Sequence, residues 1–262
     1  MKSLYKLGIF VFIMVTFSLF FLLGISLTNS TVKLTQFVTG INDWEYKIKE
    51  QTVVYYSDNT EMGKLGYKKE YSSDFPELLK KAVVAVEDRR FYAHNGLDSK
   101  GIARAVWNNI KRGKKSEGGS TITQQLARTL FLEPEKTYSR KIKEVFIASA
   151  IEGKYEKDAI LNMYLNEVFI GRGCSGMQCA AESYFGKDVM QLNEAEITVL
   201  AGMIQSPEYY SPDKNMVGLK ARQETVIDLL IEQGTISSEK GQAIYSQNIS
   251  FKPYKFYSSK NP

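Results

Sequence analysis

The sequence predicts a mainly α-helical domain that follows a single membrane-spanning helix. A run of 21 uncharged residues, Leu7 to Leu27, matches the roughly 20 apolar residues that a helix needs to cross a bilayer. From Asp74 onward, apolar residues recur at the three- and four-residue spacing of amphipathic helices. Short strand-like runs lie in residues 51–72, around the turn sequence SDNTEMG.

The apolar run predicts an uncleaved anchor with its N-terminus in the cytoplasm. It is longer than the roughly 7–15 apolar residues of a signal-peptide core, and no A-x-A cleavage site follows it. Lys2 and Lys6 precede the run and only Lys33 follows it closely, so the positive-inside rule places the later residues outside. We therefore expect a cytoplasmic tail over 1–6, a transmembrane anchor over 7–27, a stalk with a short β lead-in over 28–72, the main domain over 73–250 and a C-terminal tail over 251–262.

Cap residues and apolar stripes define the expected helices. The first follows Asp74 as its cap, with Pro76 in its first turn, and buries Leu78, Leu79, Ala82, Val83 and Val86. The second follows Asp98 and ends at Gly113, with Ile102, Ala105, Val106 and Ile110 facing inward. Further helices are expected from Thr121 through Leu132 and over 138–152, 157–168, 177–185, 193–205, 214–233 and 238–246. The pairs Thr121–Gln124 and Asn193–Glu196 have capping-box spacing.

Charge is distributed unevenly along the 262 residues, which suffice for one sizeable domain. The net charge is +5, but residues 104–143 alone hold ten Lys or Arg against three Glu, a net +7. Such a concentration favours an anionic partner. The chain has one histidine and two cysteines, which is a poor ligand set for zinc. Cys174 and Cys179 form either a disulfide or a pair of small buried thiols, and the sequence favours neither.

One carboxylate stands at the end of an apolar helix face. In KKAVVAVEDRRFYAHNG, Glu87 directly follows Val86 at the edge of the buried stripe. A carboxyl group that is partly removed from water has a raised pKa and can accept protons near neutral pH. The alternative is an ordinary helix end, at which Glu87 and Asp88 pair with Arg89 and Arg90 on the surface.

Two further segments carry polar groups at helical spacing. In EGGSTITQQLAR, Thr121, Gln124 and Arg128 share one helix face behind two glycines. A helix N-terminus with hydroxyls and amides suits phosphate or sugar hydroxyl groups, although a glycine-rich loop with an ordinary cap explains part of the pattern. In YSRKIKE, Arg140 and Glu144 are four residues apart, the spacing of a simple surface ion pair.

Taken together, these segments resemble a known family. EDRRFYAHNGLD, GGSTITQQLAR, RKIKE and ILNMYLNEVFIG are similar, in this order, to the motifs of the family 51 peptidoglycan glycosyltransferases. This is the transglycosylase module of class A penicillin-binding proteins and of monofunctional transglycosylases. The resemblance extends from about Val53 to Pro212 and includes AAESYFGK and QSPEYYSP. It implies a lysozyme-like glycosyltransferase domain.

The resemblance also implies roles for individual residues. Glu87 matches the catalytic base and Glu144 the second essential glutamate. The frame of the first motif is matched by Asp88, Phe91, His94, Gly96 and Asp98, and His94 resembles a residue that holds the loop rather than a base. The second motif, which lines the donor site, is matched by Ser120, Thr121, Gln124, Gln125 and Arg128. The pyrophosphate-binding cations are matched by Arg104, Lys136, Arg140 and Lys141, and Tyr164 and Asn166 match the last motif. Thr129 and Asn162 depart from the family pattern, where Asn and Glu are usual.

The implied reaction is the polymerisation of lipid II into glycan strands by inverting transfer onto the 4-hydroxyl of an acceptor GlcNAc, which forms β-1,4 links. The implied partners are lipid II, the growing glycan strand, the bacterial membrane and other cell-wall synthesis proteins, with no nucleic acid. No cofactor is required, although a divalent metal (Mg²⁺ or Mn²⁺) is compatible with the chemistry. The expected location is the cytoplasmic membrane, with the catalytic domain on its outer side.

Two other functions fit the same pattern less well. A lysozyme-like lytic hydrolase or lytic transglycosylase needs neither an anchor nor a pyrophosphate site, so the basic window disfavours it. A noncatalytic membrane scaffold needs neither Glu87 nor Glu144. No Lys-Thr-Gly or Lys-Ser-Gly sequence occurs, so we expect no penicillin-binding transpeptidase domain and a monofunctional enzyme.

Overall fold

The fold is mainly helical, as predicted. The computed structural model describes residues 46, 52–55, 57–65, 68–112, 118–133 and 137–254. The chain divides into two units, 1–45 and 46–262, and the first lies wholly outside the described residues. The helices are α2 (Glu77–Glu87), α3 (Ser99–Arg112), α4 (Ile122–Phe131), α5 (Tyr138–Lys154), α6 (Lys157–Glu167), α7 (Met177–Phe185), α8 (Glu194–Met203), α9 (Met216–Glu232) and α10 (Ser238–Ser246), with 3-10 turns η1 (Phe91–Ala93) and η2 (Val189–Gln191).

The predicted anchor, residues 7–27, lies outside the described residues. Among the helices that the structure describes, none combines the length and the hydropathy needed to cross a bilayer.

The strands are short and form two small sheets. β1 (Thr52–Tyr55) and β2 (Glu61–Leu65) pair antiparallel around a turn at residues 57–60, within the segment that carries the strand-like runs of the sequence. In the second sheet the order is β3-β5-β4, in which β3 (Lys68–Lys69) runs parallel to β5 (Cys174–Ser175) and β4 (Phe169–Gly171) runs antiparallel to it. This sheet joins the segment before α2 to the turn after α6.

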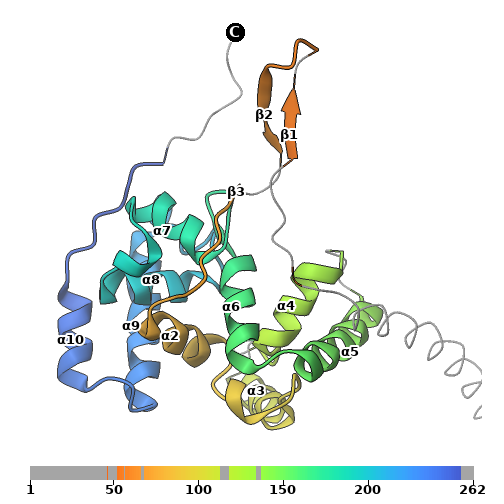
Figure 1. Cartoon of the computed structure of the whole chain (residues 1–262). Helices are drawn as coiled ribbons and strands as arrows, with labels where there is room; N and C mark the ends of the chain where they lie inside the picture. The colour runs from red at the N-terminus through yellow and green to blue at the C-terminus, as the bar shows by residue number, and fades with distance from the viewer. Residues whose placement is uncertain are drawn as a thin grey trace, which may run out of the picture. The chain divides into compact units, whose positions relative to one another are not determined.

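Two groups of helices meet around α2 (Figure 1). α8 packs against α2 and α9, whereas α4 packs against α5 and α6. The sequence of α8, EAEITVLAGM, is apolar on nearly all sides, and each residue from Ala195 to Met203 is buried. A helix with that pattern occupies the centre of a helical core. α2 therefore packs on the central helix α8, and its C-terminal residue reaches α4, which belongs to the group of α4, α5 and α6.

α2 differs from its prediction at its start. Pro76, not Asp74, is the N-cap, and no side chain caps the helix. The Asp74 carboxylate instead accepts hydrogen bonds from the backbone N–H of Phe75 and from Lys80 Nζ, both at 2.8 Å. The buried residues are Leu79, Ala82, Val83, Val84 and Ala85, whereas the predicted Leu78 and Val86 are only half-buried. The buried face is shifted because α8 and α9 both pack against α2.

The other helices lie close to their predicted ranges. The capping boxes Thr121–Gln124 and Asn193–Glu196 are both formed. α7 and α10 match their ranges, with α10 spanning Ser238–Ser246. In α3, however, Ile102 is 37% exposed, so the inward direction predicted for this residue was wrong.

A disulfide joins Cys174 of β5 to Cys179 of α7. Both cysteines are buried. The bond settles the choice that the sequence left open, and it ties the second sheet to the helix that follows it. Gly176 lies between them at φ 89°, where a Cβ atom would stand 2.6 Å from the carbonyl oxygen of Asn166. Only glycine is suited to this close approach.

Candidate active site

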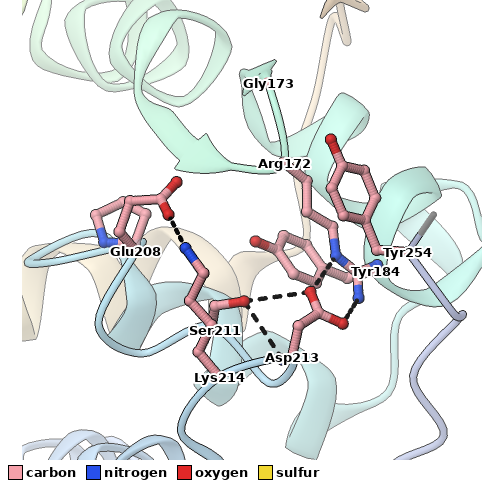
Figure 2. A pocket seen from close by; sticks show the side chains of 9 residues that line it. Arg172, Gly173, Tyr184, Glu208, Ser211, Asp213, Lys214 and Tyr254 are labelled. Carbon is pink, nitrogen blue, oxygen red and sulfur yellow. Dashed lines mark hydrogen bonds and ion pairs between the residues drawn. The ribbon is translucent and has the colours of Figure 1, made fainter. Parts of the chain in front are cut away.

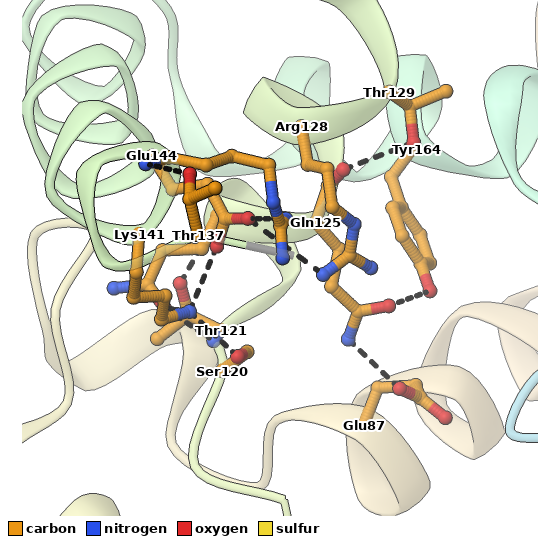
Figure 3. Close-up of polar contacts among 12 residues, drawn as sticks. Glu87, Ser120, Thr121, Gln125, Arg128, Thr129, Thr137, Lys141, Glu144 and Tyr164 are labelled. Carbon is orange, nitrogen blue, oxygen red and sulfur yellow. Dashed lines mark hydrogen bonds and ion pairs between the residues drawn. The ribbon is translucent and has the colours of Figure 1, made fainter. Parts of the chain in front are cut away.

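Glu87 is the last residue of α2 and is half-buried. Its Oε2 accepts a hydrogen bond of 2.8 Å from Gln125 Nε2 on α4. The Oε1 of the same Gln125 accepts a hydrogen bond of 3.1 Å from the hydroxyl of Tyr164 on α6. Figure 3 shows the three side chains in this order. The helix thus delivers the predicted carboxylate to a junction of three helices, not to a surface ion pair with Arg89 or Arg90.

Burial raises the pKa of Glu87 above the ordinary glutamate value of 4.5. The hydrogen bond from Gln125 and the positive charges of Arg222 and Arg128 act in the opposite direction, and the neighbouring Asp88 adds a smaller rise. Desolvation dominates because the charged carboxylate loses hydration. A carboxylate in this state is suited to accept a proton.

Asp88 holds the loop that follows α2. Its carboxylate oxygens each lie 3.0 Å from Nε2 of His94, and Oδ2 accepts a hydrogen bond of 3.1 Å from the backbone N–H of Ile122. The side chains of Asp88 and His94 are both nearly inaccessible to solvent. They therefore connect the end of α2, the η1 turn and the start of α4.

The remaining residues of the first motif pack inside the domain. Phe91 is fully buried and lies under Lys157, whose Nζ is 4.4 Å from the ring centroid. Asp98 precedes α3 and is buried, with its Oδ1 3.4 Å from Nε of Arg90. The motif thus frames Glu87 by packing and by ion pairs.

The second motif forms the N-terminus of α4. Thr121 Oγ1 accepts a hydrogen bond of 3.1 Å from the N–H of Gln124 and donates one of 2.8 Å to the carbonyl oxygen of Gly96. Thr121 and Gln124 are 2% and 1% exposed, so both side chains serve the helix cap. Of the five matched residues of this motif, Ser120, Gln125 and Arg128 are only partly buried and remain accessible to solvent.

Glu144 is fully buried beneath three cations. Its Oε1 pairs with Arg140 Nη1 and lies 4.0 Å from Arg128 Nη1, and its Oε2 pairs with Lys141 Nζ at 2.8 Å. Lys141 Nζ also donates to Ser120 Oγ at 2.7 Å and to Gln124 Oε1 at 3.1 Å. The carboxylate therefore gathers cations from α4 and α5, and Lys141 connects them to the start of α4 (Figure 3).

The other two predicted cations are Arg104 and Lys136. Arg104 is exposed on α3, and Lys136 lies outside the described residues.

A divalent metal does not fit at Glu144, because its carboxylate oxygens already pair with Arg140 and Lys141. Elsewhere in the described part of the chain, no three His, Cys, Asp or Glu side chains are grouped so that they could hold a metal ion.

Three contacts of the site connect residues distant in sequence, and sequence reasoning missed them. Tyr164 matched a motif, but its bond to Gln125 spans 39 positions. Arg222 on α9 affects Glu87 electrostatically, and its Nε donates to the carbonyl oxygen of Gly202 at 3.2 Å. The Asn166 amide accepts a hydrogen bond from the backbone N–H of Ser72 and donates one to its carbonyl oxygen, so it anchors the segment before α2.

A separate cavity of about 170 Å³ lies beside the turn between β4 and β5 (Figure 2). None of its lining residues was predicted as a site residue. Arg172 donates from Nε and Nη2 to the Asp213 carboxylate at 2.9 and 2.7 Å, and from Nη1 to the carbonyl oxygens of Ser183 and Lys252. This arginine thus holds together four segments of the chain.

Comparison with known proteins identifies the family. Residues 49–230 match the family model described as Transglycosylase. Penicillin-binding protein 1F of Bacillus subtilis is 45% identical over 172 residues, which are 64% of this chain and 24% of that protein. Penicillin-binding protein 2D of the same organism is 38% identical over 211 residues, 79% of this chain and 30% of that protein. The crystal structure of penicillin-binding protein 1A from Haemophilus influenzae matches with a TM-score of 0.45 and 19% identity, over 81% of this chain and 22% of that one.

The family model covers more than half of the chain, so the chain belongs to the transglycosylase family. Its match includes Glu87, Glu144 and the helices that carry them. The chain spans only about a quarter to a third of the length of the two Bacillus proteins.

Proposed function

We propose that this transglycosylase is a peptidoglycan glycosyltransferase that polymerises lipid II. The observation that carries the proposal is the half-buried Glu87, whose raised pKa suits a base, with a separate cluster of cations on α4 and α5. Transfer from a pyrophosphate needs a base and a cluster of cations. It needs no acid to protonate the leaving group, because pyrophosphate leaves once its charge is neutralised.

In the proposed reaction, the Glu87 carboxylate accepts the proton of the 4-hydroxyl of the acceptor GlcNAc. The oxygen forms a bond to C1 of the donor MurNAc while the bond from C1 to the pyrophosphate oxygen breaks. The attack comes from the opposite face, so an α-linked donor yields a β-1,4 link. Lipid pyrophosphate departs with the electron pair of the broken bond.

Arg128, Arg140 and Lys141 are proposed to receive the negative charge of the departing pyrophosphate. Glu144 fixes their positions, since it pairs with all three. Preorganised charges of this kind need no rearrangement as the charge develops. Ser120, through its contact with Lys141, adds a hydroxyl to the same surface.

We also propose that residues 7–27 anchor the enzyme in the cytoplasmic membrane, and that the domain has a lysozyme-like fold and lies on the outer side. A substrate carried on a lipid requires a catalytic site near the bilayer surface. The disulfide between Cys174 and Cys179 supports an oxidising location. Other cell-wall synthesis proteins are the expected partners.

The test uses labelled lipid II and the purified full chain. The wild type should produce glycan polymer, and Glu87→Gln should reduce the rate by about 10²- to 10⁴-fold, the usual contribution of a general base. Binding of lipid II should persist in the variant. Cleavage of preformed glycan without polymer formation would instead favour a lytic enzyme, and no change in either substrate would favour a scaffold.

A further inference from the structure

We infer that Tyr164 is a positioning residue for the transfer: its hydroxyl fixes the orientation of the Gln125 amide, and this amide holds the carboxylate of Glu87. The inference rests on the proposed function, because it assumes that Glu87 accepts the proton of the acceptor. It adds a residue on a fourth helix, α6, to a site otherwise built from α2, α4 and α5.

The three groups form one chain of hydrogen bonds. The Tyr164 hydroxyl lies 3.1 Å from Gln125 Oε1, and Gln125 Nε2 lies 2.8 Å from Glu87 Oε2 (Figure 3). Tyr164 is only 2% exposed, so water does not compete for its hydroxyl. Hydrogen bonds in such surroundings are stronger than in water, and an unpaired group there is unfavourable.

The chain of bonds has a fixed direction. An ionised carboxylate only accepts hydrogen bonds, so the Gln125 amide must present its NH₂ group to Glu87. Its oxygen then faces Tyr164, which must donate. If the amide turned over, its oxygen would oppose a carboxylate oxygen, and its NH₂ group would face the phenol. The Tyr164 hydroxyl therefore stabilises the orientation that supports an ionised Glu87.

Tyr164 orients the site and does not carry protons. Burial raises the pKa of its phenol well above 10, with a further contribution from the charge of Glu87. The hydroxyl thus stays protonated throughout the pH range in which Glu87 titrates.

The charged groups that face Glu87 are Asp88 at the end of α2, Arg128 on α4 and Arg222 on α9. Burial raises the Glu87 pKa, while the Gln125 hydrogen bond and both arginines lower it. Loss of the tyrosine hydroxyl weakens the contribution of Gln125 and leaves the three charges in place. The Glu87 pKa should then rise further.

The experiment measures kcat/KM for lipid II polymerisation against pH in Tyr164→Phe. The acidic limb of the profile should move to higher pH by about half to one unit, and the rate at neutral pH should fall about two- to tenfold, as for one ordinary hydrogen bond. Tyr184→Phe is the matched control, because it also removes a buried hydroxyl, bonded to the carbonyl oxygen of Ile170 at 3.0 Å, but in another part of the fold. Its acidic limb should coincide with that of the wild type.

A double-mutant cycle completes the test. Gln125→Met removes both hydrogen bonds and should shift the acidic limb in the same direction. In the Gln125→Met protein, adding Tyr164→Phe should cause no further shift of the acidic limb. An unshifted limb in Tyr164→Phe or in Gln125→Met, or additive effects in the cycle, would overturn the inference. If Tyr164→Phe does not fold, an unshifted limb in Gln125→Met still overturns the inference. Failure of the proposed function is separate, since it would appear as near-normal polymerisation by Glu87→Gln.

Discussion

Glu87 combines an unfavourable environment with a chemical role. Its folded-state pKa is raised, so the folded protein favours the protonated form more strongly than the unfolded chain does. The stability associated with this group is fully present below the unfolded pKa of about 4.5 and is lost as the pH rises through the folded value. At neutral pH the ionised carboxylate therefore destabilises the fold.

A neutral side chain in place of Glu87 should therefore not destabilise the protein at neutral pH. Glu87→Gln removes a destabilising charge while it keeps the size of the side chain and an oxygen that can accept from Gln125. We expect the Tm at pH 7 to stay equal or rise, while polymerisation falls by about 10²- to 10⁴-fold. Thermal unfolding at pH 7 and pH 4 checks the point, since the difference from the wild type should shrink at the lower pH. A Tm that drops together with activity would mean that Glu87 is a structural ion-pair partner.

Substitution of Glu144, unlike that of Glu87, should destabilise the protein. Glu144→Gln leaves Arg128, Arg140 and Lys141 close together without their carboxylate. Since these cations are partly exposed, we expect a loss of about 1–3 kcal/mol in the free energy of unfolding, with weaker lipid II binding. Denaturant unfolding and binding measurements test both effects. Glu77→Gln, which affects an exposed carboxylate paired with Lys80, should change neither; equal effects in the two variants would contradict a special role for Glu144.

Arg128 and Lys141 are not equivalent members of the cluster. Lys141 Nζ contacts Ser120, Gln124 and Glu144, so Lys141→Ala should affect the fold as well as binding. The Arg128 side chain is 41% exposed, and its Nη1 lies 4.0 Å from Oε1 of Glu144. We expect Arg128→Ala to raise the KM for lipid II about tenfold to a hundredfold, the value of a charge-assisted hydrogen bond, with little change in Tm. A matching fall in Tm would argue against a pyrophosphate contact.

At the scale of the elements, the start of α4 links the two glutamates. Thr121 caps the helix that carries Gln125 and Arg128, and its hydroxyl also donates to Gly96 in the loop after Glu87. Thr121→Val should lower the free energy of unfolding by about 1–2 kcal/mol, as for loss of an N-cap. It should also reduce polymerisation activity more than Thr121→Ser does. The valine and serine variants are compared by denaturant unfolding and by initial polymerisation rates. Equal rates in the two variants would show that the cap does not position the site.

Local patterns predicted most of the elements, and non-local contacts explain the misses. The helix over 177–185 and both capping boxes follow from spacing within a few residues. Asp74 failed as a cap because Pro76 takes that position, and no pattern distinguishes a cap from a nearby ion pair with Lys80. Spacing assigned Gln124 to the cap, but it could not show that Gln125 faces Glu87, because that contact depends on where α4 lies relative to α2 and α6.

At the scale of the molecule, Arg172 connects distant segments. Its side chain is 2% exposed and pairs with Asp213, the carbonyl oxygens of Ser183 and Lys252, and the Tyr184 ring at 4.3 Å. Arg172→Ala leaves the partly exposed Asp213 carboxylate with the Ser211 hydroxyl but without its cation, and should lower the free energy of unfolding by about 1.5–3 kcal/mol. The specific activity of the folded fraction should be unchanged. The exposed Lys214, which pairs with Glu208, is the control: Lys214→Ala should have almost no effect on stability.

The topology of the whole chain can be tested through the anchor and the disulfide together. Lys2 and Lys6 favour a cytoplasmic N-terminus, and a disulfide between Cys174 and Cys179 persists in an oxidising compartment but is rare in the cytosol. Protease added to intact spheroplasts should therefore degrade residues 28–262, while a cytoplasmic marker survives. Thiol alkylation of the denatured protein from the same cells should occur only after reduction. Protection of the domain together with free thiols would reverse the orientation, and would place the domain on the side opposite to the growing glycan.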